Sequence, residues 1–539
     1  MARRTWSGSG LGWPALIRGA RAEDGGRGSA VPLALRRCTF TETQYVTSRL
    51  IGFMRFPHLF QGSHQARQRR RVRLMWTAAF LAFTSLLPAF FKLSWAGEPR
   101  VNAVTPTRGA IRLMDGTLVA VHTAQGRQYP LGPMAANVVG FLGADGGLEG
   151  LERTLNAELA QGKSQTLTLN GTIQAAAEQV LEEAVKRVEA ASGSVVVMDR
   201  HTGHLLAVAN WPTFDPGAWA GTVPAQWRNR AFVDEYEPGS VIKALTVAAL
   251  LEENLTSPAQ VYETPMRRPY AGTVINDLVP HPSVLRTWEI LRYSSNVGMT
   301  RLIENVPPMT LHRAFQAFGL GLAVELPGPT ANGSLAAPDR WTPLTQATMS
   351  FGQGLSVTNL QMAAAFNVIA NDGVYIAPRL SPDQPRRTRR VLRPDVARTM
   401  QRLLHAVIDE GIQSRAELPG YHVGGKTGTA QVAIGGRYSS EVFTSTFAGF
   451  FPAEQPRYTV TVMVRGAKRE YQGSQLAAPI FRDITAYILS MNGALPALIP
   501  PPTTHEADEV GAQSDRAAER SARASREAAG PEAGPVHGP

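Results

Sequence analysis

Cysteine is almost absent from this chain: its 539 residues include one, Cys38, close to the N-terminus. Because the rest of the chain contains no cysteine, it can form neither disulfide bonds nor cysteine-ligated metal sites. The histidines are scattered without the spacing of a metal site, and no glycine-rich phosphate-binding loop is present. We therefore expect a functional site that uses neither a metal ion nor another cofactor.

Charge is also scarce outside the N-terminus. The net charge of +11 suggests a nucleic-acid ligand at first sight, but residues 1–73 alone hold 14 arginines against three acidic residues, which equals the whole excess. The rest of the chain is close to neutral, so we expect no nucleic-acid partner. Hydrophobic residues at 44% and charged residues at 18% are globular values, and the length leaves room for several domains.

An apolar run, residues 74–91, directly follows a cluster of arginines that ends at Arg73. About 18 apolar residues can span a bilayer, and arginines on the N-terminal flank predict that this side is cytoplasmic. We expect one transmembrane anchor over residues 74–92, with the C-terminal bulk outside the cytoplasmic membrane. The alternatives are a buried core helix and a signal peptide cleaved near Ala96.

The two ends of the chain lack a regular pattern. Residues 1–73 are rich in glycine and arginine, and we expect a disordered cytoplasmic segment, with translation from Met54 as the alternative. Residues 496–539 contain a run of prolines and are then rich in alanine, glutamate, arginine, serine and glycine. This composition predicts a disordered tail.

Between these ends, hydrophobic periodicity predicts an α/β domain. Apolar residues at helical spacing predict helices over 148–159 and 173–188, and a closing helix over 479–491. Apolar runs bounded by turn residues predict strands. They cover residues 194–198, 205–209, 444–451 and 458–464.

Three short motifs carry the chemistry: Ser240-Val-Ile-Lys243, then Ser294-Ser295-Asn296, then Lys426-Thr427-Gly428-Thr429. A nucleophilic serine needs a base within hydrogen-bond reach and a site that stabilises the developing oxyanion. Ser240 and Lys243 are three residues apart in a helix-favouring stretch, so their side chains share one helix face. Lys243 can accept the serine proton if burial or a nearby cation, such as Lys426, lowers its pKa.

The third motif suits a strand at the edge of a sheet. Its small residues let the strand approach a substrate closely, and its hydroxyl groups can hold a carboxylate. Each motif alone could be an ordinary helix turn, helix cap or strand. The three together, in this order, predict an active-site serine acyltransferase.

These motifs resemble those of the class B penicillin-binding proteins, whose transpeptidase domain carries such a trio. The resemblance extends over roughly residues 165 to 492 and includes Asn229-Arg230-Ala231, Tyr236 to Ser240, Gly354 to Thr358, Leu326 to Gly328, Phe447 to Phe450 and Ala477 to Phe481. It implies an α/β fold like that of serine β-lactamases, a sheet flanked by helices, over residues 164–495. It also implies a peptidoglycan D,D-transpeptidase that cross-links stem peptides through an acyl-serine and is acylated by β-lactams.

The resemblance also implies a role for each site residue. Ser240 is the nucleophile, Lys243 its general base, and Ser294 a proton relay to the leaving group. Asn296 orients the substrate amide. Lys426 and Thr427 hold the terminal carboxylate, and the backbone N–H groups of Ser240 and of Thr429, which follows Gly428, form the oxyanion hole.

Residues 97–163 resemble a shortened form of the family's non-catalytic pedestal, at Arg108 to Ile111 and Gly147 to Glu152. Leu113-Met114 stand where the family usually has Asp-Arg. The resemblance implies a membrane-bound partner, a lipid-II polymerase of the SEDS type. The stretch Ser294 to Met299 resembles the septal rather than the elongation type, which implies a role in cell division.

Two other functions within the superfamily stay open, a D,D-carboxypeptidase or β-lactamase and a non-catalytic β-lactam sensor. Glu152-Arg-Thr-Leu-Asn156 matches the E-x-x-L-N string of class A β-lactamases, in which the glutamate deacylates the enzyme. There the string lies between the second and third motifs, whereas here it precedes Ser240. We therefore expect a coincidence on a solvent-facing side of a helix.

Overall fold

The computed structural model describes residues 108–410 and 415–491. Within these ranges no helix is both long and apolar enough to cross a bilayer. The expected anchor at 74–92, the segment 1–73 and the tail 496–539 lie outside the described residues.

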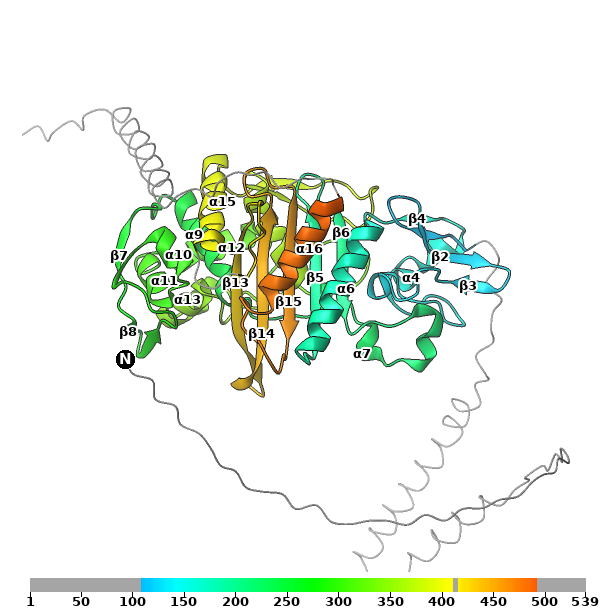
Figure 1. Cartoon of the computed structure of the whole chain (residues 1–539), viewed down its shortest axis with the longest axis horizontal. Helices are drawn as coiled ribbons and strands as arrows, with labels where there is room; N and C mark the ends of the chain where they lie inside the picture. Colours follow the sequence, from blue (N-terminus) through cyan, green and yellow to red (C-terminus); the bar gives the residue numbers. More distant parts are fainter. Residues whose placement is uncertain (1–107, 411–414, 492–539) are drawn as a thin grey trace, which may run out of the picture. The chain divides into compact units, whose positions relative to one another are not determined.

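An antiparallel five-stranded sheet in the order β13-β14-β15-β5-β6 organises the larger part of the structure (Figure 1). Its strands are β5 (Ser192–Asp199), β6 (Leu205–Trp211), β13 (Gly424–Ile434), β14 (Arg437–Phe451) and β15 (Tyr458–Arg465). All four predicted strands are confirmed, and β14 begins earlier than predicted. Because β15 pairs with β5, the last of the described strands lies beside the strand of this sheet that comes first in the sequence.

Alternate residues of the strands bury opposite faces of this sheet, as the two-residue period of a strand requires. Val195 and Val197 pack in one core cluster with α6 (Gly171–Arg187) and α16 (Ala477–Met491). Val196 and Met198 face the other side. The predicted helices over 173–188 and 479–491 are confirmed, and the Asn170 side chain caps α6 by accepting hydrogen bonds from Thr172 and Ile173.

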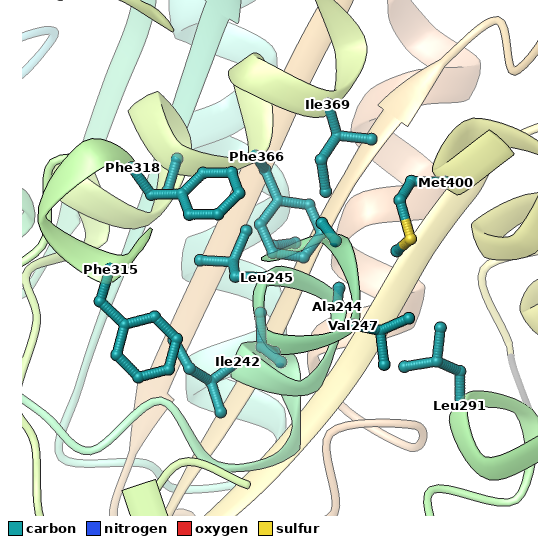
Figure 2. Packing of buried hydrophobic residues seen from close by; sticks show 14 of the residues in the cluster. Ile242, Ala244, Leu245, Val247, Leu291, Phe315, Phe318, Phe366, Ile369 and Met400 are labelled. Atoms are coloured by element: carbon teal, nitrogen blue, oxygen red, sulfur yellow. The ribbon is translucent and has the colours of Figure 1, made fainter. Parts of the chain in front are cut away.

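The second core surrounds α9 (Ile242–Glu252), in which every residue from Ile242 to Leu251 is buried. A helix that is apolar on nearly every side belongs in the interior of a protein, and Lys243 and Thr246 are the polar exceptions in this buried stretch. Figure 2 shows Ile242 and Leu245 packed among phenylalanine side chains, which include Phe315 and Phe366. The predicted helix after Ser240 is thus confirmed and is held by neighbours on all sides.

The remaining elements of this part are mostly short, apart from the helices α12, α14 and α15. They are η2 (Pro216–Gly221), α7 (Pro224–Trp227), α8 (Arg230–Val233), η3 (Gly239–Val241), β7 (Val261–Glu263), β8 (Arg267–Tyr270), β9 (Thr273–Asn276), β10 (Val284–Arg286), α10 (Thr287–Arg292), α11 (Asn296–Leu302), α12 (Pro308–Ala317), η4 (Pro338–Arg340), α13 (Pro343–Ser350), α14 (Asn359–Ala370), β11 (Val374–Ile376), β12 (Thr388–Arg390) and α15 (Pro394–Asp409).

A small sheet in the order β3-β2-β1-β4 lies in the N-terminal part of the described chain. It consists of β1 (Ile111–Arg112), β2 (Leu118–Thr123), β3 (Gly126–Gln128) and β4 (Gln165–Thr166), accompanied by α3 (Ala136–Val139), α4 (Gly150–Thr154) and α5 (Asn156–Ala160). The leucine repeat over 148–159 therefore forms two short helices, and Leu148 precedes them with 45% of its surface exposed.

The expectation that Glu152 lies on a solvent-facing side of a helix is wrong. Its side chain is fully buried and accepts hydrogen bonds from Arg108 (2.6 Å to Nη2) and from Arg127 (2.6 Å to Nε). Arg108 also donates to Asn156 Oδ1 at 2.9 Å. Glu and Asn of the E-x-x-L-N string thus bind the same arginine, and a buried carboxylate with two cationic partners has a structural role here.

Replacing Glu152 with glutamine should destabilise this region strongly. The substitution leaves two buried guanidinium groups without their carboxylate, and breaking such a pair costs about 3–5 kcal/mol. Thermal unfolding measures the loss, and Arg153→Gln, at an exposed neighbour in α4, is the control. Equal unfolding midpoints for the two variants would contradict a stabilising role for this network.

Candidate active site

The first motif lies where η3 passes into α9. Ser240 is half-buried in η3, one turn before Lys243 in α9. Gly239 precedes it with φ of +58°, a backbone conformation that favours glycine. The Gly239 N–H donates to the Gly352 carbonyl at 3.0 Å, which fixes the turn that presents Ser240. No residue within the described ranges hydrogen-bonds the Ser240 hydroxyl, which leaves it free for a substrate.

Lys243 is completely buried, and its amine lies against the second motif. Nζ donates to the Ser294 carbonyl at 2.5 Å and to Asn296 Oδ1 at 2.7 Å, and it lies 3.3 Å from Ser294 Oγ. Burial lowers the pKa of Lys243 well below its usual value, and the charge of Lys426 lowers it further, while Asp277 acts in the opposite direction. A buried lysine with a depressed pKa can act as a base near neutral pH.

The second motif forms a tight turn before α11. Ser294 has φ of +54°, which is uncommon for a residue other than glycine. Ser295 is the N-cap of α11, because its Oγ accepts a hydrogen bond from Gly298 N at 2.7 Å. The turn thereby presents the Ser294 hydroxyl and the Asn296 amide to Lys243.

The third motif lies on β13, an edge strand that pairs with β14 among the described strands. Lys426 is 2% exposed, and its Nζ donates to Ser294 Oγ at 3.1 Å and to its neighbour's carbonyl, Thr427 O, at 3.2 Å. Burial lowers the pKa of Lys426 to about 8. The Ser294 hydroxyl therefore lies between two lysine amines.

Thr427 is half-buried on β13 and Thr429 is exposed, so both can be reached from solvent. The Thr429 hydroxyl accepts a hydrogen bond from Gly473 N at 2.9 Å, which attaches the loop after β15 to this strand. The eight predicted site residues lie in three segments of the chain. At the centre of the site, the Ser294 hydroxyl contacts the amines of Lys243 and Lys426. The predicted oxyanion hole and the individual roles remain predictions.

Close packing of β13 against η3 requires glycine at position 428. A Cβ atom there would lie 2.4 Å from Thr446 Oγ1 and 2.6 Å from the Pro238 carbonyl oxygen. Real Cβ atoms do not approach other atoms so closely, so a side chain would push β13 away from the turn that holds Ser240.

Gly428→Ala should consequently slow acylation of Ser240 by about 10²-fold, since a displacement of about 1 Å can cost that much in rate. The second-order acylation constant with a fluorescent penicillin measures the effect. Gly221→Ala is the matched control, because a Cβ at Gly221 meets no atom within 4 Å. Equal rates for both variants would show that β13 can shift without consequence.

Sequence reasoning missed two residues next to the site, Asp277 and His281. The Asp277 carboxylate accepts hydrogen bonds from Ser295 Oγ at 2.5 Å and from Val297 N at 3.1 Å. His281 Nε2 lies 2.8 Å from the same carboxylate. Both residues lie in a segment without a motif, well before Ser294, so no local signal pointed to them.

Within residues 108–410 and 415–491, no group of three or more His, Cys, Asp or Glu side chains is arranged to hold a metal ion. The expectation that the site uses no cofactor remains a prediction.

Comparisons with known proteins agree with this geometry. The family model described as the penicillin-binding protein transpeptidase domain matches residues 193–486. The penicillin-binding protein PbpB of Mycolicibacterium smegmatis is 34% identical over 437 residues, with 71% of this chain and 67% of that protein aligned. The peptidoglycan D,D-transpeptidase FtsI of Escherichia coli is 32% identical, with 67% of each chain aligned.

Solved structures give the same result. The structure of penicillin-binding protein 3 from Mycobacterium tuberculosis in complex with aztreonam superposes with a TM-score of 0.68 at 35% identity. The alignment covers 73% of this chain and 97% of that chain. The similarity thus includes nearly all of the solved part of that protein.

Proposed function

This chain belongs to the class B penicillin-binding proteins, the peptidoglycan D,D-transpeptidases, and from that premise we propose that its site cross-links stem peptides through an acyl-Ser240 intermediate. The observation that carries the proposal is the line of contacts from Lys243 through Ser294 to Lys426, next to a free serine hydroxyl. This arrangement can remove a proton from one group and deliver it to another.

The hydrogen bonds of Lys243 suit a neutral amine. A neutral amine has two N–H groups and one lone pair, and the Ser294 carbonyl and Asn296 Oδ1 accept the two N–H groups. The lone pair then remains for a hydroxyl proton. As the carbonyl of the penultimate D-alanine arrives, Lys243 takes the Ser240 proton, and Oγ forms a bond to the carbonyl carbon.

Collapse of the tetrahedral intermediate breaks the bond to the terminal D-alanine. The departing nitrogen receives the proton from Lys243 through the Ser294 hydroxyl, which Lys426 holds from the other side. An amine of a neighbouring strand then attacks the ester carbonyl, passes its own proton to Ser240 and leaves a new amide. The Ser240 hydroxyl and the Lys243 amine thereby return to their starting protonation states.

Substrate recognition in this proposal rests on charge. Lys426 is cationic below its pKa of about 8, and together with Thr427 it attracts the terminal carboxylate. Asn296 orients the substrate amide, and the N–H groups of Ser240 and Thr429 stabilise the oxyanion. β-Lactams imitate the D-Ala-D-Ala terminus and acylate the same serine.

Product analysis tests the reaction. The purified protein is given a pentapeptide that ends in D-Ala-D-Ala, with and without an amine acceptor, and mass spectrometry follows the products. We expect acceptor-linked peptide with release of one D-alanine. Hydrolysed tetrapeptide alone, even at high acceptor concentration, would make the protein a carboxypeptidase, and rapid turnover of penicillin would make it a β-lactamase.

We further propose the membrane topology that the sequence predicts. The segment 74–92 anchors the protein once in the cytoplasmic membrane with residues 1–73 inside, and residues 97–163 form a reduced pedestal below the catalytic domain outside. A SEDS-type lipid-II polymerase supplies the glycan strands and docks on the anchor and the pedestal, at the division septum.

Exchange of the anchor for an unrelated transmembrane helix should preserve penicillin binding and impair complementation of a strain that lacks the protein. Full complementation would show that the anchor takes no part in this docking.

A further inference from the structure

Asp277 directly follows β9 and holds the second motif from behind. Its side chain accepts hydrogen bonds from Ser295 Oγ at 2.5 Å, from Asn296 N at 2.5 Å and from Val297 N at 3.1 Å. The residue is 9% exposed. The carboxylate therefore restrains both the N-cap of α11 and the backbone that carries Asn296, which in turn contacts Lys243.

His281 lies behind Asp277, and its two ring nitrogens both face oxygen acceptors. Nε2 is 2.8 Å from Asp277 Oδ2 and Nδ1 is 2.7 Å from the Pro282 carbonyl oxygen, while the side chain is fully buried. These two contacts fix the orientation of the buried ring, which lies in hydrogen-bond contact with the carboxylate that holds the second motif.

We propose that His281 is a positioning residue for acylation, which acts through Asp277 to hold the Ser294–Asn296 turn against Lys243. The inference rests on the proposed function and adds two residues to it. Neither touches the reacting atoms, so neither is a catalytic residue. Their contribution lies in the geometry and in the protonation of Lys243.

Charge balance gives the proposal a direction. The Asp277 carboxylate raises the pKa of Lys243, against the larger effect of burial. Two other charged side chains lie near the turn. Lys426 comes from β13 and contacts Ser294. Arg268 of β8 donates hydrogen bonds to Thr300 in α11 and to Glu304, which follows that helix. The Tyr293 ring lies 5.7 Å from the His281 ring.

Two substitutions should differ in their effect on the pH dependence of acylation. His281→Gln keeps the Asp277 carboxylate and removes the ring that holds it, so the rising limb of the acylation rate stays in place. Asp277→Asn removes the negative charge, so that limb moves to lower pH. In both variants the limiting acylation rate constant should fall about 10-fold or more, the scale seen when a partner that orients a functional group is lost.

The experiment uses the full-length protein and a fluorescent penicillin. Stopped-flow kinetics between about pH 5 and about pH 10 give two constants at each pH: the dissociation constant of the non-covalent complex and the acylation rate constant. We expect the dissociation constant to stay within about twofold, because the pair does not touch the ligand. The double variant should be no slower than the slower single variant, since both residues act in one chain. His312→Gln, at a half-buried histidine outside this cluster, is the control.

A rising limb that stays in place or moves to higher pH in Asp277→Asn would overturn the proposal, and so would an unchanged limiting acylation rate constant in His281→Gln. So would a loss confined to the dissociation constant. If His281→Gln does not fold, Asp277→Asn, which keeps the size of the side chain, decides by the direction of its shift. Failure of the wild-type protein to form any acyl-Ser240 would instead refute the proposed function itself, so the two failures are distinguishable.

Discussion

Replacing Ser240 with alanine should abolish acylation by penicillin while the protein stays folded. The second and third motifs contact each other through Ser294 and lie next to Ser240. No described residue forms a hydrogen bond with the Ser240 hydroxyl. Intact-mass spectrometry of the wild-type protein after penicillin treatment should show a single adduct, which maps to the peptide that contains Ser240. The Ser240→Ala variant should show none.

The serine substitution is structurally mild, because Ser240 is half-buried and its hydroxyl stabilises no described neighbour. Ser283→Ala, at an exposed serine in the segment before the second motif, is the matched control and should label like the wild type. An adduct that persists in Ser240→Ala would assign the nucleophile to another residue. Ser294, whose hydroxyl lies 3.3 Å from Lys243 Nζ, would then be the first candidate.

Lys243→Arg should reduce the acylation rate constant by at least about 10²-fold, the lower end of what general-base catalysis contributes. Arginine keeps the positive charge and the hydrogen-bond donors but does not lose its proton in proteins. The structure shows why the difference matters here. Burial and Lys426 both lower the pKa of Lys243, and neither can make an arginine neutral.

Thermal unfolding separates loss of the base from loss of the fold. Lys243 is completely buried beside the Ser294 carbonyl, so a larger guanidinium group can also disturb packing. Thermal unfolding of each variant therefore accompanies the kinetics, with Lys163→Arg, at an exposed lysine, as the control. Acylation at a near-normal rate by folded Lys243→Arg would mean that the base lies elsewhere.

The parts of the fold with a strong local period were predictable. Strands β5 and β15 are rich in valine and other apolar residues, and α6 and α16 repeat their apolar residues at helical spacing, so local sequence sufficed. The leucine repeat over 148–159 was less informative. It forms two short helices, because spacing alone does not reveal where a helix breaks.

The chemical types at the site were also readable from sequence. Ser240 and Lys243 share a helix face because of local geometry, and glycine and threonine suit an exposed strand edge. These residue types, in that order along the chain, determined the reaction class and the family.

Tertiary structure alone decided which charges the site contains and how they act. Ser294 meets Lys243 across 51 positions and Lys426 across 132 positions of sequence, so the depressed pKa of Lys243 depends on packing that no local pattern encodes. The burial of Glu152 between two arginines and the pairing of His281 with Asp277 have the same origin. Electrostatic energy and desolvation depend on distances in space, whereas a motif records distances along the chain.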